Sequence, residues 1–388
     1  MKITVVHPAE LGESEVARWR SIQRATPSLA NPFLSPEFTV AVGRLRSRAR
    51  VAVLFDGPEI VGFFPFERRG LGYGVPIGAG YTDCQGLVHL PDVDWDPREL
   101  LGACRLAVWE FDHLVDGQKP FEPHKSVRVL SPIMDLSAGF DPFLERLRKS
   151  SSRWRDISRK RRKLAREVGE LRFVFDSRDH QLLRTVMVWK SAQYVRTGWA
   201  DRFARPWMVQ LLEQLLHTRT EGFSGVLSML YAGDEPVAGH FGLRSESVMA
   251  HWFPAYDTRF GGYSPGLAMH LGLAEAAAAA AIQHIDLGTG TEGYKQWLRS
   301  RDLVVAQGRV VRGSPGAALH WMRRAPVERL HRAVRQNPSL YRAAKRVRSG
   351  IDSAQRRRAA TEAYGHRRGS EMLGRLISEH APSITGDS

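Results

Sequence analysis

The segment 259–266 reads RFGGYSPG and combines residue types that bind phosphate groups. Backbone N–H groups in a glycine-rich turn and in the first turn of a helix point toward anions, and an arginine side chain adds a charged donor. A flexible loop before an ordinarily capped helix would contain the same residues. We predict that this segment binds the phosphates of a ligand through Arg259, Gly261, Gly262, Ser264 and Gly266.

Two other glycine motifs suggest different chemistry, and each lacks a part that its chemistry requires. The segment 262–266 matches the Gly-x-Ser-x-Gly motif of serine hydrolases, but Pro265 follows the serine and has no N–H for an oxyanion. Ser264 and Pro265 suit a helix start instead, as N-cap and first helical residue. The segment 288–293 matches Gly-x-Gly-x-x-Gly, but no acidic residue ends the next strand, as dinucleotide binding requires. The sequence therefore disfavours a serine hydrolase and a dehydrogenase.

Hydrophobic periodicity places the phosphate-binding loop in an ordered series of elements. Strands are predicted at 50–55, 60–66, 225–231, 236–243, 248–255 and 283–287. Helices are predicted at 143–168, 182–193, 207–216, within the alanine-rich stretch after the loop, and briefly after residue 292. The glycine-rich segment 70–86 is expected to be a loop rather than regular structure.

The positive charge is concentrated in the later parts of the chain. The 388 residues carry a net charge of +15, of which −2 falls in residues 1–140, +8 in 141–312 and +9 in 313–388. The run 146–166 contains 11 basic residues and one acidic residue. Such density suggests an anionic partner, either a membrane surface or tRNA, with no strong evidence for DNA. A solvated helix face and GC-rich coding would also account for it.

The remaining composition excludes several classes of protein. Two cysteines cannot form a disulfide framework or a cysteine-rich zinc site, and the scattered histidines show no metal-ligand spacing. The longest apolar stretch, 267–282, is too short and too polar to span a bilayer. No signal peptide is visible. We expect a protein without a metal, located in the cytoplasm, with peripheral attachment at the inner membrane face as an alternative.

The order of these elements resembles the core of GNAT acyltransferases, and Arg259-x-x-Gly262-x-Ser264 resembles their pyrophosphate loop, with serine where glycine or alanine is usual. Over about residues 30–310, further motifs resemble the CelD/BioF-type acetyltransferase-like family, which is related to the FemABX peptidyltransferases. They are NPFLSPEF (31–38), WKSAQY (189–194), RTG (196–198), HWFPAYD (251–257), YSPG (263–266), IDLG (285–288) and Tyr294-Lys295.

This resemblance implies an α/β (α+β) fold of two tandem GNAT-like lobes. The first lobe would comprise residues 1–140, and the second, 141–312, would carry the acyl-donor site. Residues 313–388 would form a basic helical tail with a disordered end. The implied reaction moves an acyl group from acyl-CoA, with acetyl-CoA expected, to an amine or hydroxyl group. The acceptor would be a small molecule, a saccharide or a cell-envelope precursor.

The resemblance also implies roles for individual residues. Lys295 would stabilise a tetrahedral oxyanion, and Tyr294 would donate to the leaving thiolate. The proton acceptor is left open between His240, whose ordinary pKa is about 6.5, and Asp83. A buried core histidine and a turn-forming aspartate are the structural alternatives for these two residues. Residues expected to bind the substrate are Lys190, Tyr194 and Arg196.

Two other functions fit parts of the sequence. A FemABX-like transferase would use aminoacyl-tRNA as donor and hold the RNA through its basic segments, although no heptad pattern predicts the coiled-coil arm common in that group. A non-enzymatic module would bind an anionic membrane or nucleic acid through residues 313–388, where apolar residues recur at helical spacing between arginines.

Overall fold

The structure is a computed structural model that describes residues 1–149, 151–290 and 293–313. Among these residues, one compact unit comprises 1–193 and 202–313, and 194–201 belong to a second unit. The architecture below is that of the first unit. The predicted tail lies outside the described residues, apart from Gly313 at its start.

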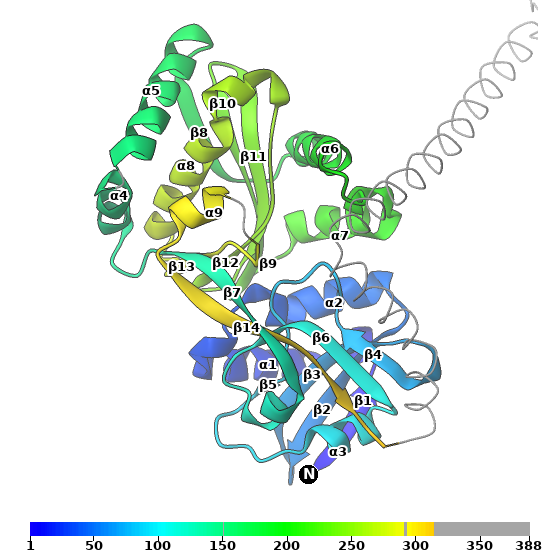
Figure 1. The fold of residues 1–388 in the computed structure, drawn as a ribbon. Helices are drawn as coiled ribbons and strands as arrows, with labels where there is room; N and C mark the ends of the chain where they lie inside the picture. Colours follow the sequence, from blue (N-terminus) through cyan, green and yellow to red (C-terminus); the bar gives the residue numbers. More distant parts are fainter. Residues whose placement is uncertain (150, 291–292, 314–388) are drawn as a thin grey trace, which may run out of the picture. The chain divides into compact units, whose positions relative to one another are not determined.

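The first half of the unit runs from strand β1 to strand β7 (Figure 1). Its main elements are β1 (Lys2–Val6), α1 (Glu13–Ala25), α2 (Pro36–Leu45), β2 (Ala49–Asp56), β3 (Glu59–Arg68), β4 (Tyr73–Pro76), β5 (Val88–His89), α3 (Pro97–Ala103), β6 (Val108–Val115) and β7 (Lys125–Asp135).

The second half opens with two further helices and then repeats this order. Its elements are α4 (Phe140–Lys149), α5 (Ser151–Glu167), β8 (Leu171–Ser177), α6 (His180–Thr197), α7 (Pro206–His217), β9 (Arg219–Thr220), β10 (Phe223–Ala232), β11 (Glu235–Arg244), β12 (Val248–Tyr256), η7 (Thr258–Tyr263), α8 (Pro265–Ala279), β13 (His284–Asp286), α9 (Gly293–Leu298) and β14 (Arg301–Val311). In each half a strand and two helices precede three antiparallel strands. A helix then leads to a further strand, which pairs in parallel with the third of these strands: β6 with β4, and β13 with β12.

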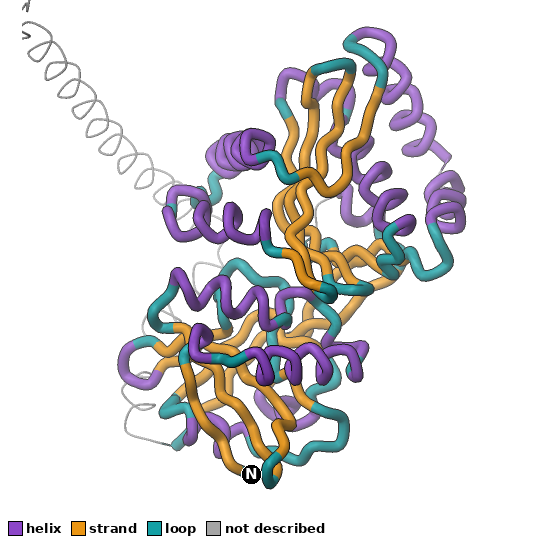
Figure 2. The backbone as a smooth tube through the Cα atoms, turned by 180° about the vertical axis from the view of Figure 1, so that it is seen from behind, coloured by secondary structure: helices purple, strands orange, loops and turns teal. Residues whose placement is uncertain are grey.

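The strands in the described ranges join one fourteen-stranded sheet, in which the two halves exchange their last strands. The order is β1-β2-β3-β4-β6-β14-β7-β13-β12-β11-β10-β8, and Figure 2 shows the strands running from one half into the other. β14, the last strand of the second half, pairs with β6 of the first half, and β7 pairs with β13 of the second. Each half therefore depends on the other to complete its sheet.

Side chains on both faces of the sheet are buried, as expected for strands covered by helices. Along β10, Leu227 and Met229 pack against α6 and α7, whereas Val226 and Leu230 pack against α4, α5 and α8. Small residues let α8 lie close to its neighbours: a Cβ atom at Gly272 would be 2.7 Å from the ring of Phe173. The alanine-rich composition of α8 thus serves close packing on both sides.

These elements confirm the predicted α/β fold with two tandem halves. The helix predicted at 143–168 is two helices, α4 and α5. The expectation of a loop at 70–86 is wrong in part, because Tyr73–Pro76 forms β4. Gly74 allows β4 to lie close to Leu106, since a Cβ atom at position 74 would be 2.6 Å from the Leu106 side chain. The boundaries at residues 140 and 312 stay predictions.

Within the described ranges no helix has the length and apolarity needed to cross a bilayer.

A substitution in β14 tests the exchange of strands. Gly308 pairs with Phe111 on one side and Lys125 on the other, and a Cβ atom there would lie 2.1 Å from the carbonyl oxygen of His124. We expect Gly308→Ala to lower the free energy of unfolding by about 1–3 kcal/mol, because backbone must shift to admit the methyl group. Urea denaturation measures this. Gly70→Ala is the control, since no atom lies within 4 Å of its Cβ position, and an equal loss in both variants would contradict the exchange.

Candidate active site

A cavity lies beside strand β12. This strand pairs in parallel with β13 only from Val248 to Ala250, beside His284 to Asp286, and continues along β11 to Tyr256. The cavity has a volume of about 300 Å³, and its walls come from the last part of β12 and from α6, η7, α8 and α9. Five residues predicted from the sequence line it: Lys190, Gly261, Ser264, Gly266 and Tyr294.

The predicted phosphate-binding loop forms one end of this cavity. Space around its glycines is open: no atom lies within 4 Å of a Cβ position at Gly262, and at Gly261 and Gly266 the nearest atoms belong to Tyr256, at 3.8 and 3.6 Å. Packing therefore does not require glycine at these positions, and the open space is suited to a ligand that approaches the backbone closely.

Ser264 occupies the N-cap position of α8, but its side chain does not cap the helix. Its backbone is left-handed, with φ at 54°, and its hydroxyl group makes no hydrogen bond to the helix backbone. The Lys160 ammonium group instead donates to Ser264 Oγ at 3.2 Å. The predicted helix start at Ser264 and Pro265 is therefore confirmed in position, and the serine side chain connects the basic helix α5 to the loop.

Arg259 lies on η7 with its side chain 66% exposed. Its guanidinium group pairs with Asp257 at 2.8 Å and with Glu235 at 3.2 Å. To bind a phosphate it would exchange one of these carboxylates, of which only Glu235 is exposed, for the ligand. The donor role of Arg259 stays a prediction, and Lys160 is a second cation at the loop.

Three buried histidines form a stack that leads from the sheet to the cavity. The ring centroids of His240 and His251 are 4.5 Å apart, those of His251 and His270 4.8 Å, and those of His270 and Tyr294 5.0 Å. Burial lowers the pKa of all three histidines, with the neighbouring positive charges as further causes, to about 3 for His240 and about 4 for His270.

These surroundings argue against His240 as the proton acceptor. The side chain is fully buried, and within the described part of the chain neither ring nitrogen has a hydrogen-bond partner. A ring with a pKa of about 3 is a weak base near neutrality. The structure therefore favours the alternative interpretation of His240 as a buried core histidine.

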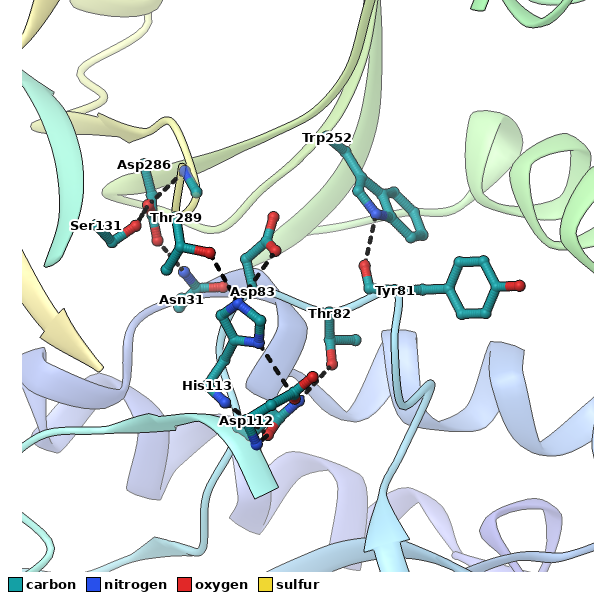
Figure 3. Close-up of polar contacts among 12 residues, drawn as sticks. Asn31, Tyr81, Thr82, Asp83, Asp112, His113, Ser131, Trp252, Asp286 and Thr289 are labelled. Atoms are coloured by element: carbon teal, nitrogen blue, oxygen red, sulfur yellow. Dashed lines mark hydrogen bonds and ion pairs between the residues drawn. The ribbon is translucent and has the colours of Figure 1, made fainter. Parts of the chain in front are cut away.

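A polar cluster lies where β6 of the first half approaches the end of β13 (Figure 3). The His113 Nε2 atom is 3.0 Å from Thr289 Oγ1 and 3.9 Å from Asp83 Oδ1. The other ring nitrogen, Nδ1, is 3.1 Å from Asp112 Oδ1. Burial raises the pKa of Asp83, against the positive charges of His113, Arg202 and Lys295, although 32% of its side chain is accessible. The cluster thus places a carboxyl group with a raised pKa 3.9 Å from an imidazole ring.

A buried carboxylate holds this junction together. Asp286 accepts hydrogen bonds from Ser131 Oγ at 2.7 Å, from the side-chain amide of Asn31 at 3.2 Å and from the N–H of Gly288 at 3.0 Å. Gly288 has a φ of +70°, and a Cβ atom there would lie 2.8 Å from Asp83 Oδ2. Only glycine allows both this turn and the approach of Asp83.

Helix α9 separates the cavity from the polar cluster. Tyr294 lines the cavity, whereas the next residue, Lys295, is buried and donates to the carbonyl oxygens of Gly288 at 3.3 Å and Thr289 at 2.8 Å. The structure therefore brings Lys295 and Asp83 to one site, as expected from the sequence. Their roles stay predictions.

The remaining predicted residues lie on α6. Lys190 lines the cavity, and its ammonium group donates to the carbonyl oxygen of Pro254 at 3.0 Å. Tyr194 and Arg196 belong to the second compact unit, and their substrate-binding role stays a prediction.

Residues 151–296 match the acetyltransferase (GNAT) domain family. The match covers α5 to α9 and therefore includes the phosphate-binding loop, the cavity and Lys295. No curated protein matches the chain.

Several solved structures are similar in fold. The C-terminal DUF2156 domain of an Agrobacterium fabrum protein named as a lysylphosphatidylglycerol synthetase is 12% identical, with a TM-score of 0.49, over 79% of this chain and 96% of that one. A tandem GNAT protein of clavulanic acid biosynthesis is 13% identical, with a TM-score of 0.45, over 81% and 99%. FemX is 12% identical, with a TM-score of 0.46, over 67% and 87%.

The sequence did not reveal several polar residues at the site. Asp112, His113 and Thr289 were missed because His113 and Thr289 are 176 positions apart and meet only in the folded chain. The one local signal was the adjacent Asp-His pair in a strand of the first half that is mainly apolar. Lys160, which lies in the GNAT domain, was predicted only as one member of the basic run 146–166 and not as a residue of the site. Within the described ranges no three histidine, cysteine or acidic side chains are arranged to hold a metal ion.

The buried histidines of the GNAT domain predict acid sensitivity. Below a pH of about 6.5 the unfolded chain takes up protons at these rings, whereas the folded chain does not until about pH 4 or lower. Stability is therefore present above about pH 6.5 and is lost as the pH falls, by about 1.4 kcal/mol per pH unit for each ring.

The variant His240→Phe keeps an aromatic ring and removes one of these protonation sites. We expect its free energy of unfolding to fall less steeply between about pH 6 and about pH 5, by roughly 1.4 kcal/mol per unit. Urea denaturation at several pH values measures the slope. An unchanged slope in the variant would show that His240 also takes up its proton in the folded state.

Proposed function

We propose that the protein is an acyl-CoA-dependent acyltransferase, which moves an acyl group from the thioester to an amine or hydroxyl group of a second substrate. The observation that supports this most directly is the cavity beside β12, which residues of the predicted phosphate-binding loop help to line. A cavity of about 300 Å³ with a predicted anion site in its wall suits a long thioester arm that carries a diphosphate.

The residues of the cavity fit such a donor. Its diphosphate would lie against the open glycine backbone of the loop, with Lys160 and Arg259 as cations. The arm would pass along Pro254 and Tyr256 toward His270 and Tyr294. His270, whose pKa burial lowers to about 4, gives this part of the cavity a polar lining without charge, which an uncharged amide-containing arm tolerates well.

The polar cluster at the end of β13 would receive the second substrate. Asp83 and His113 can accept the proton that the attacking group loses, and the Lys295 ammonium group can stabilise negative charge on the thioester oxygen. Tyr294, at the cavity wall, would donate to the departing thiolate. The first half of the chain thus supplies proton-accepting groups and the GNAT domain supplies the donor site.

The resemblance to the CelD/BioF-type family narrows this proposal. It supports acetyl-CoA as donor and a saccharide or cell-envelope precursor as acceptor, with the reaction taking place in the cytoplasm. One motif of this resemblance contacts the site. Trp252 on β12 donates a hydrogen bond to the carbonyl oxygen of Tyr81 at 2.8 Å, and Tyr81 lies two residues before Asp83.

Removing the cations of the loop tests the donor site. We expect Lys160→Ala and Arg259→Ala each to weaken coenzyme A binding about tenfold, because each would remove a charge-assisted hydrogen bond worth about 1.5 kcal/mol. Isothermal titration calorimetry measures the affinity. Arg184→Ala is the matched control, because Arg184 pairs with Glu213 on neighbouring helices and does not line the cavity. Unchanged affinity in both loop variants would refute this donor site.

Lys295 is expected to act on the reaction more than on binding. Lys295→Ala should lower the turnover of acetyl-CoA by about a hundredfold or more, since the oxyanion loses its cation, while coenzyme A affinity changes only slightly. Free thiol release with a panel of amines and alcohols measures turnover. Thermal unfolding of the variant controls for lost structure, and full activity would remove Lys295 from the mechanism.

A further inference from the structure

The exposed face of helix α5 carries a row of arginines that the proposed function leaves unused. The members of this arginine row are Arg155, Arg159, Arg162 and Arg166, and all four residues are exposed. Their spacings of four, three and four residues place them within about 60° of one another on an α-helix and spread them over about 16 Å. We propose that the arginine row docks the protein on an anionic membrane surface, with lipid phosphate groups as its ligands.

Packing fixes the direction in which the arginine row points. Ile157 and Leu164 lie on the opposite side of α5, and both are buried in a core that also contains residues of α4 and α8. Figure 1 shows α5 at the margin of its half, with α8 on its inner side. The arginine row therefore faces away from the core of the described residues.

The positive charge of α5 exceeds what its own carboxylates can balance. The helix contains eight basic and two acidic residues. Asp156 is shared by Arg159, at 2.7 Å, and Lys160, at 2.9 Å, and Glu167 is likewise shared by two cations. Like charges at this density destabilise a helix, so external anions beside the arginine row would stabilise α5.

The composition of this face favours a membrane over a nucleic acid. Proteins that hold single strands of RNA or DNA combine cations with aromatic rings on which the bases stack. Within the described parts of α4 and α5, the aromatic side chains Phe140, Phe143 and Trp154 all pack on the core, and neither helix carries a large exposed apolar residue. Cations on the outer side of a helix, without rings for stacking, suit a planar layer of lipid phosphates, to which guanidinium groups donate paired hydrogen bonds.

The end of helix α4 adds further positive charge next to α5. Arg148 and Lys149 are exposed, and the guanidinium group of Arg148 lies 5.7 Å from the ring of Trp154 on α5. Each basic residue close to an anionic leaflet strengthens binding about fivefold. Several such residues on two adjoining helices therefore suffice for an attachment that is electrostatic and reversed by salt.

The docking surface is separate from the proposed donor site. Lys160, on another side of α5, donates to Ser264 in the phosphate-binding loop, whereas the described residues that line the cavity include no member of the arginine row. The docking therefore does not depend on the proposed reaction. It would bring the enzyme to the lipid surface at which a cell-envelope precursor is met.

Co-sedimentation of the full-length protein with vesicles tests the docking. We expect binding to vesicles made from equal parts of phosphatidylglycerol and phosphatidylcholine at about 0.1 M NaCl, and release at about 1 M, because the screening length falls from about 10 Å to about 3 Å. Vesicles of phosphatidylcholine alone should bind at least tenfold more weakly, since they carry no net charge.

Two variants of equal net charge separate the arginine row from the overall charge of the chain. The row variant combines Arg155→Gln, Arg159→Gln, Arg162→Gln and Arg166→Gln, and it should bind the anionic vesicles about a hundredfold more weakly. The control variant changes four exposed arginines outside α4 and α5: Arg44→Gln, Arg48→Gln, Arg98→Gln and Arg184→Gln. It should bind within about threefold of the natural protein. Both variants keep residues 313–388 with their net charge of +9, and thermal unfolding checks that both are folded.

Several results would overturn the docking surface. An equal loss in both variants would show that net charge alone drives attachment, and unchanged binding in the row variant would place attachment elsewhere in the chain. Absence of binding to the anionic vesicles would refute the docking directly. A gel shift in which the natural protein binds total tRNA more tightly than vesicles, and the row variant does not, would assign the arginine row to nucleic acid instead. Calorimetry with coenzyme A on the same proteins reports the proposed acyl transfer separately, because it measures the donor site alone.

Discussion

The buried carboxylate of Asp286 is the interaction on which the arrangement of the site depends. It is 4% exposed, and removing such a charge from water is costly unless donors replace the lost hydration. Ser131 on β7, Asn31 before α2 and the N–H of Gly288 supply those donors. These three donors come from distant parts of the sequence. The Asp286 carboxylate therefore links the end of β13 to two segments of the first half and to the start of the loop that follows β13. Loss of one donor would leave the Asp286 carboxylate with fewer hydrogen bonds and weaken the contacts among these segments.

The exchange of the last strands has a related effect on the site. Because β14 lies between β6 and β7, the strand that bears Asp112 and His113 is anchored by a strand of the second half. The strand that bears His113 and the strand that lines the cavity, β12, therefore belong to one continuous sheet.

Much of the fold could be predicted from local patterns, and much of the site could not. The strands β10, β11 and β12 and the helix α8 follow from apolar runs and turn residues, and the phosphate-binding loop follows from its glycines. Ser264 and Pro265 begin α8 as predicted, but the left-handed backbone at Ser264 cannot be read from Ser-Pro, which is a common helix start. For His240 the sequence left a catalytic and a core position open, because its burial and the positive charges of His270 and Lys190, which lower its pKa, depend on other elements. Asp112, His113 and Thr289 carry no signal until β6 and β13 are brought together.

The topology also sets an order of events during synthesis. When β6 and β7 leave the ribosome, the strand that will lie between them has not yet been made, and the edge of β6 is left with unpaired backbone groups. The first half cannot finish its sheet until β14 follows, after the whole of the GNAT domain. Exposed strand edges recruit other chains, so this nascent protein passes through a long interval in which it is prone to aggregation. A chaperone that shields β6 until translation reaches residue 311 would protect the yield of folded enzyme.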